Sequence, residues 1–171
     1  MKKITSVSLI AAVLASVSLA IAAHESKDSS KTTAAAVSEH ILVTPPEVKW
    51  GDAPPGVPAG AQLAVLEGDP GKKGPFTVRF QAPDGYKIPP HTHPTAEKIT
   101  VISGTMLIGT GAKFDETAMR EMSVGSFSVM PAGMQHFVSM KGQTVIQVSG
   151  DGPFEIKYVN PADDPRKTTK Q

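Results

Sequence analysis

Three histidines and one glutamate lie at spacings that could bring them to a single metal ion. One segment places His91, His93 and Glu97 close together, and a later segment ends in His136. Residues two apart in a strand face the same side, so His91 and His93 should point the same way, and Glu97 keeps that phase if the strand continues. Three imidazoles and a carboxylate form a nitrogen and oxygen donor set that suits manganese, iron, nickel, copper or zinc. We therefore predict a site for one divalent transition metal.

Glycine and proline residues surround both segments and fix how the chain enters and leaves them. Pro89 and Pro90 stiffen the approach to His91, and Gly104 allows a reversal after the strand. A turn that contains Gly133 leads to His136. Any one of these histidines alone would more often be a structural, hydrogen-bonded residue. The combined spacing favours a metal site.

The two segments also resemble the two sequence motifs of the cupin family. Gly85, five residues, His91-x-His93, three residues, Glu97, six residues and Gly104 match the first motif. The second motif is matched by Gly125, five residues, Pro131-x-Gly133, two residues and His136. The resemblance covers about residues 61–159. It implies a jelly-roll barrel in which the metal ligands are His91, His93, Glu97 and His136. One position departs from the pattern, because Met140 stands where the second motif often has asparagine.

A four-ligand site on a six-coordinate metal leaves two positions open, which is typical of catalytic metals. We therefore expect a metal-dependent enzyme that acts on a small organic molecule, either an oxygenase or a lyase or decarboxylase. The alternative is a non-catalytic cupin that binds a small ligand or senses a metal, since fold alone does not choose between these functions.

Candidates for catalytic residues other than the metal ligands are few. Glu97 could act as a base, although a ligand role is simpler, and Tyr86 could donate a proton, although a structural aromatic at the barrel rim is the simpler interpretation. We expect Gln135 to face outward beside His136, and Arg79 to face away from the apolar side of its strand.

Short strands separated by glycine, proline and aspartate turns must position these residues. The sequence shows no internal repeat and no sustained helical period, and residues 113–122 favour a loop or a single turn over a helix. The fold class expected is all-β, a cupin-type jelly-roll barrel of short antiparallel strands. The predicted strands are Gln62–Glu67, Phe76–Ala82, Lys98–Ile102, Thr105–Gly109, Ser126–Met130, Phe137–Met140, Thr144–Val148 and Phe154–Val159.

The regions outside the barrel differ from it in composition. Lys2 and Lys3 precede an apolar, serine-containing run that ends in small residues, which predicts a signal peptide cleaved after Ala22 and a periplasmic or secreted protein. The expected organisation is a signal peptide (1–22), a disordered linker (23–40), an extended arm rich in proline and glycine (41–60), the barrel (61–160) and a polar, frayed tail (161–171).

Charge and cysteine content limit the partners. The formal net charge is +1, with 17 Lys and Arg against 16 Asp and Glu, and loss of Lys2 and Lys3 with the leader would make it slightly negative. This balance argues against nucleic acid or an anionic membrane surface as a partner. We also expect no stable membrane insertion after the signal peptide is cleaved. The absence of cysteine excludes disulfides and thiolate ligands. We expect a small-molecule substrate or ligand and a homodimer formed through sheet edges.

Overall fold

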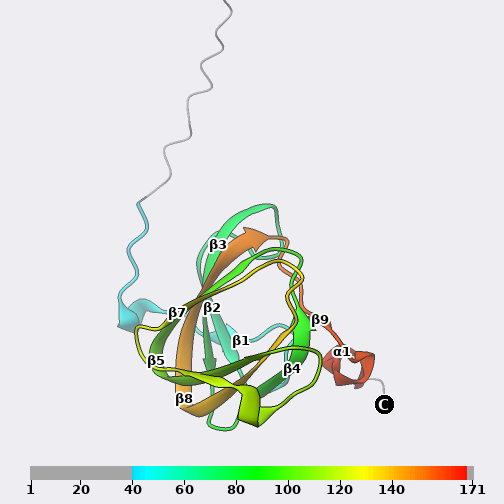
Figure 1. Cartoon of the computed structure of the whole chain (residues 1–171). Coiled ribbons are helices and arrows are strands. Elements are labelled where there is room, and N and C mark those ends of the chain that lie inside the picture. Colours follow the sequence, from blue (N-terminus) through cyan, green and yellow to red (C-terminus); the bar gives the residue numbers. More distant parts are fainter. Residues whose placement is uncertain (1–39, 169–171) are drawn as a thin grey trace, which may run out of the picture. The chain divides into compact units, whose positions relative to one another are not determined.

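An antiparallel sheet of nine strands curls around a shared core in the computed structural model, which describes residues 40–168 (Figure 1). The predicted signal peptide, most of the predicted linker and residues 169–171 lie outside the described part. The strands are β1 (Gly51–Asp52), β2 (Gln62–Glu67), β3 (Gly74–Ala82), β4 (Lys87–Thr92), β5 (Glu97–Thr110), β6 (Arg120–Met122), β7 (Phe127–Met130), β8 (His136–Gly152) and β9 (Lys157–Tyr158). Between and around them lie the 3-10 turns η1 (Pro45–Glu47), η2 (Glu116–Ala118) and η3 (Pro161–Asp163), and one helical turn, α1 (Pro165–Thr168).

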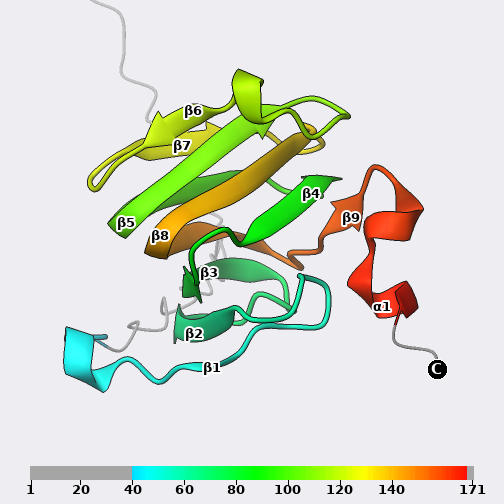
Figure 2. The same cartoon turned by 90° about the horizontal axis from the view of Figure 1, so that it is seen from below.

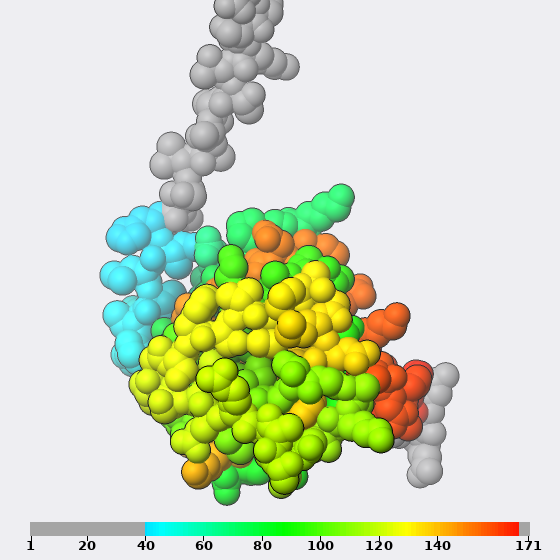
Figure 3. Space-filling model, viewed as in Figure 1, coloured from blue at the N-terminus to red at the C-terminus, as the bar shows by residue number. Residues whose placement is uncertain are grey.

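The long strand β8 connects the two sides of the sheet. It pairs with β3, β4 and β5, while β5 also pairs with β6 and β7, and every pairing is antiparallel. Figure 2 shows β5, β6 and β7 on one side, β1 to β3 on the other, and β4 and β8 between them. In the view of Figure 3, much of the surface comes from the yellow-green and yellow segment that carries η2, β6 and β7. The predicted all-β antiparallel class is therefore confirmed.

Two predicted strand pairs are each one continuous strand, and this part of the prediction was wrong. Lys98–Ile102 and Thr105–Gly109 both belong to β5, while Phe137–Met140 and Thr144–Val148 both belong to β8. Gly104 in β5 and Gly142 in β8 are residues that typically end a strand, which is why the sequence pattern predicts two strands in each place.

In the structure, a bulge replaces the expected turn inside β5. The pairing register of β5 with β8 shifts on both sides of Ser103, and Gly104 takes the left-handed backbone conformation with φ of 74°. The Thr144 hydroxyl accepts from the Thr105 N–H at 3.1 Å and donates to the Thr105 carbonyl at 3.0 Å. These bonds keep the two strands together where a glycine would otherwise weaken the ladder.

Strand β4 forms where the sequence suggested only a stiff approach. Pro89 and Pro90 lie at a register shift between Ile88 and His91, a position where missing N–H donors are tolerated. In contrast, the predicted strand Phe154–Val159 shrinks to β9. The expected loop or single turn at 113–122 is present as η2, followed by the short β6.

The core fills the space inside the curl. Phe76, Val78 and Phe80 on β3 are all buried, and Arg79 between them faces the other side of the strand, as predicted. Fully burying each such side chain contributes about 1.5–3 kcal/mol relative to exposure.

The arm and the C-terminal segment close one side of the barrel. The Tyr158 hydroxyl donates to the Gly56 carbonyl at 2.9 Å, and the Tyr86 hydroxyl donates to the Pro58 carbonyl. Arg166 donates to the Ile156 carbonyl at 3.1 Å. The predicted tail (161–171) is therefore ordered as η3 and α1 over its described part, which ends at residue 168. Among residues 40–168, no helix is long and apolar enough to cross a membrane.

Candidate metal centre

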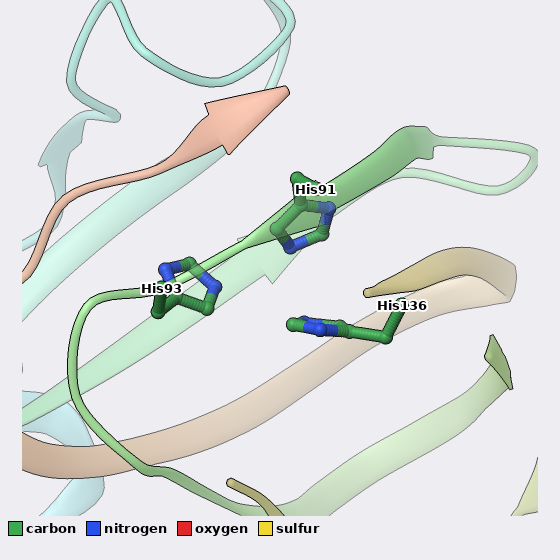
Figure 4. A group of neighbouring side chains, drawn as sticks. All are labelled: His91, His93 and His136. Carbon is green, nitrogen blue, oxygen red and sulfur yellow. The ribbon is translucent and has the colours of Figure 1, made fainter. Parts of the chain in front are cut away.

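The three histidines of the two motifs meet at the boundary between β4 and β8. His91 lies on β4, His93 follows directly after this strand, and His136 is the first residue of β8. His91 and His136 are cross-strand partners, and their ring centroids are 4.2 Å apart. All three rings are buried, and they point toward one another in Figure 4. One nitrogen of each ring lies within 4.8 Å of the others, so the three could hold one metal ion.

Backbone carbonyls fix the orientation of each ring. Nδ1 of His91 lies 2.7 Å from the Pro89 carbonyl, and Nδ1 of His136 lies 3.0 Å from the Met134 carbonyl. For His93, Nδ1 lies 2.7 Å from the Glu155 carbonyl. A carbonyl can only accept, so each Nδ1 carries the proton and each Nε2 presents a lone pair. This is the outer-shell arrangement that keeps metal-binding histidines in the required tautomer.

Glu97, the first residue of β5, faces the same group of lone pairs. Its Oε2 lies 3.2 Å from Nε2 of His136 and 3.7 Å from Nε2 of His93. When Nδ1 carries the imidazole proton, Nε2 and Oε2 are both acceptors. Within residues 40–168, Nε2 of His93 and Oε2 of Glu97 are buried without a hydrogen-bond partner. Such groups are costly unless a cation lies between them.

The pKa shifts follow from this environment. Burial, together with the charges of His136 and His93, lowers the pKa of His91 to about 3. Burial also lowers the pKa of His93, although the Glu97 charge opposes it. For His136 burial acts to lower the pKa, but the hydrogen bond and charge of Glu97 outweigh burial and raise it. Burial acts to raise the pKa of Glu97, while the histidines lower it overall. If His136 were protonated at Nε2, it would donate to Oε2 of Glu97, so a proton can compete with a metal for this pair.

The residues present fit a divalent metal. Three neutral imidazole nitrogens are oriented toward one point, and an unpartnered carboxylate oxygen lies beside two of them. This donor set suits first-row transition metals and does not distinguish among manganese, iron, nickel, copper and zinc.

A main-chain hydrogen bond joins the two motifs directly. The Gly133 N–H donates to the His93 carbonyl at 2.9 Å, and Gly133 has a φ of 74°. The Met134 N–H closes the same turn on the Pro131 carbonyl at 3.1 Å. The turn before β8 therefore positions His136 and also holds the backbone at His93.

A largely apolar cavity of about 460 Å³ opens beside the site, within the range of small-molecule pockets. His91, His93 and Glu97 form one part of its wall. We call this part, together with His136, the metal end. Asp52, Pro54 and Val57 from the arm form another part, which we call the arm end. The remaining wall is formed by Leu63, Pro70, Gly71, Phe76, Val78, Phe80, Ile88, Ile146, Val148, Phe154 and Ile156.

The other residues singled out in the sequence have different positions. Tyr86 is buried, its hydroxyl is used by Pro58, and it does not line the cavity, which favours the structural interpretation. Gln135 is exposed, as expected. Met140 is buried in the core, and its main chain bonds Gly85 and Tyr86, so no side-chain amide is needed there.

Sequence reasoning missed three contributors to the site. The Phe154 ring stacks on His93 with centroids 4.1 Å apart and planes 14° apart, and the Glu155 carbonyl holds His93. Asp52 also reaches the cavity from the arm. None of the three belongs to a motif, and only the fold brings them to the site.

Comparison with known proteins assigns the chain to a family. A family model described as a domain of unknown function, DUF4437, matches residues 41–167. Germin-like protein 5-1 from Oryza sativa subsp. japonica is 38% identical over 64 residues, which are 37% of this chain and 28% of the rice protein. The chain therefore spans only a small part of the length of that curated relative.

Solved structures share the fold at low sequence identity. The polyketide cyclase RemF from Streptomyces resistomycificus superposes with a TM-score of 0.58 at 19% identity, over 78% of this chain and 94% of that one. A putative acetylacetone dioxygenase from Methylibium petroleiphilum PM1 gives 0.57 at 19% identity, over 74% and 85%. An RmlC-like cupin from Shewanella frigidimarina NCIMB 400 gives 0.52 at 13% identity, over 67% and 91%. The chain therefore has a cupin-type jelly-roll fold, and it belongs to the DUF4437 family.

Proposed function

We propose that this cupin is a metal-dependent enzyme that acts on a small organic molecule, with His91, His93, His136 and Glu97 as the metal ligands. The observation that carries the proposal is the convergence of three oriented Nε2 lone pairs beside a cavity large enough for a substrate. A purely structural metal would not need such a cavity next to its ligands.

A divalent metal bound there would supply Lewis acidity and open coordination positions directed at a substrate oxygen. The protein's own residues do the rest. The apolar wall excludes water from the cavity, and Phe154 holds the His93 ring by stacking. Glu97, buried and unpartnered at Oε2, is the group that could accept a proton if it leaves the metal.

Within this class, oxygenase chemistry is the first choice, and lyase or decarboxylase chemistry is the second. Two proteins of similar fold are called a polyketide cyclase and a putative acetylacetone dioxygenase, and these names guide the choice of substrates to screen. The cavity volume of about 460 Å³ is large enough for small oxygenated organic molecules.

We also propose that the chain is exported after cleavage at Ala22 and works in the periplasm or outside the cell as a homodimer. An exported protein that folds before it binds metal would meet zinc and copper, which bind such sites more strongly than manganese or iron. Mass spectrometry of secreted protein tests the cleavage site, and sedimentation analysis tests the dimer. An intact N-terminus or a monomer at micromolar concentration would refute the respective proposal.

The central experiment loads metal-free protein with Fe(II), Mn(II), Ni(II), Cu(II) and Zn(II) in turn. Each form is screened with diketones, flavonoids and carboxylic acids for oxygen uptake and for new products. We expect turnover with at least one metal, loss of turnover in His136→Ala and reduced turnover in Glu97→Gln. Tight ligand binding without turnover in every metal form would instead indicate the non-catalytic alternative. Failure to bind any of the metals stoichiometrically would refute the metal centre.

A further inference from the structure

The cavity wall has an unusual shortage of polar side chains. Among the described residues, its polar side chains are Asp52, His91, His93 and Glu97, and the wall contains no lysine, arginine, hydroxyl or amide side chain. The charged groups on the wall are therefore both acidic, apart from the histidines. A bound molecule finds side-chain hydrogen-bond partners only among these four residues.

Two arginines close to residues of the wall, Arg79 and Arg166, do not line the cavity themselves. Arg79 lies between Val78 and Phe80 on β3 but faces the opposite side of the strand. Arg166, behind Ile156, donates to the Ile156 carbonyl and to Asp164. No guanidinium from these positions is directed at the cavity.

Lys72 follows Gly71, a residue of the wall, in the chain. It is exposed and forms an ion pair with Asp69 at 3.0 Å. An anionic group on a ligand would therefore have only the metal end as a positive partner.

Aromatic contacts indicate how the wall runs between its two ends. Phe154 stacks on His93 and contacts Phe76 with ring centroids 5.0 Å apart, so Phe76 lies toward the metal end. Phe80 contacts Tyr86, whose hydroxyl binds the arm at Pro58, with centroids 5.8 Å apart. Four residues of a strand span roughly 13 Å. The apolar side chains of Phe76, Val78 and Phe80 therefore extend along the wall over about this length.

From these observations we infer the substrate class: a largely apolar molecule that carries its polar oxygen atoms at one end only and has at most one anionic group. The inference rests on the proposed metal site, because the polar end needs a partner at His91, His93 and Glu97. Dicarboxylates are excluded, because no cationic or hydrogen-bond-donating side chain of the wall outside the metal end could partner their second anionic group.

The experiment compares three probes of the same size class on the zinc-loaded protein. Acetophenone and benzoate each carry one polar group on a phenyl ring, and terephthalate adds a second carboxylate at the far end of the benzoate ring. Isothermal titration and ligand-observed NMR give the Kd of each probe without any turnover. We expect acetophenone and benzoate to bind, and terephthalate to bind at least about 10-fold more weakly than benzoate.

Variants on the arm establish that the binding is in this cavity. Asp52 is exposed, so its substitution should not disturb the fold. Asp52→Lys should reduce the ratio of the terephthalate Kd to the benzoate Kd several-fold. Asp52→Asn, the matched control, should reduce this ratio less. Val57→Trp should weaken all three probes by filling the arm end, while the metal affinity stays the same.

Equal or tighter binding of terephthalate to the wild-type protein would overturn the inference. The inference would also be overturned if none of the three probes bound, or if neither Asp52→Lys nor Val57→Trp changed the probe affinities. These outcomes are separate from a failure of the proposed function, which would appear as a lack of metal binding or of turnover in the metal series. A protein that discriminates the probes as expected but never turns over would retain the ligand class and lose only the enzyme assignment.

Discussion

At the metal end of the cavity each histidine ring is fixed by a backbone carbonyl, whereas at the arm end two tyrosine hydroxyls fasten a proline-rich loop over the barrel. The metal end is built mostly from strands β4, β5 and β8; β5 shares a long ladder with β8, and β4 pairs with β8 at Lys87, Ile88 and His91. The arm end has only the two residues of β1 in the sheet. The difference suggests that the chemistry is fixed by the rigid part of the fold and that selectivity is set by the more weakly attached part.

The largest effect should come from removing a ligand at the metal end. His136→Ala removes an imidazole that is almost completely buried and faces Glu97. We expect the metal affinity to fall by about 100-fold or more, measured by competition with a chromogenic chelator. His40→Ala, at an exposed histidine outside the site, is the control and should leave the affinity unchanged. Full metal retention in His136→Ala would show that this ring is no ligand.

Placing the asparagine of the motif at position 140 should lower the stability of the protein. Met140 is buried in the core, and its main chain bonds Gly85 and Tyr86. Met140→Asn should therefore lower the free energy of unfolding by about 1–3 kcal/mol, because the amide is buried without a partner. Urea denaturation measures it, with Met140→Leu as the volume-matched control. A variant as stable as the wild type would mean that a partner for the amide exists behind the site.

The pH dependence of metal binding should reveal one competing proton, not three. The lowered pKa values keep His91 and His93 neutral below the ordinary histidine value of 6.5, whereas the raised pKa keeps His136 protonated in the metal-free protein. As the pH rises toward 6.5, the metal affinity should therefore rise with a slope of about one proton, which is about tenfold per pH unit. Titrations at several pH values test this. A slope near three protons would show that all three rings are protonated in the metal-free protein.

The smallest effect should follow the loss of one arm contact. Tyr158→Phe removes the hydroxyl that donates to the Gly56 carbonyl and should reduce the free energy of unfolding by about 1 kcal/mol. Amide exchange in residues 51–60 should become faster, while the metal affinity remains unchanged. A large loss of metal affinity would contradict the separation of the two ends.

The metal end could be predicted from the sequence because its residues follow fixed offsets. His91, His93 and His136 need only a strand phase and a turn to meet, and the glycines and prolines around them mark those turns. The arm end could not be predicted in this way. Asp52 and Phe154 lie outside both motifs, and only the folded chain brings them to the cavity. The glycines inside the long β5 and β8 predict strand ends, whereas the structure continues both strands through a register shift.

The hydrogen bond between the Gly133 N–H and the His93 carbonyl has a consequence for how the sequence can change over evolutionary time. Both partners are main-chain atoms, so a change of side chain at position 93 leaves the bond's donor and acceptor in place. Position 133 is more restricted, because its backbone conformation favours glycine. A descendant could therefore replace the chemistry at position 93 while the two segments stay joined, which makes the centre a scaffold on which ligands can be exchanged.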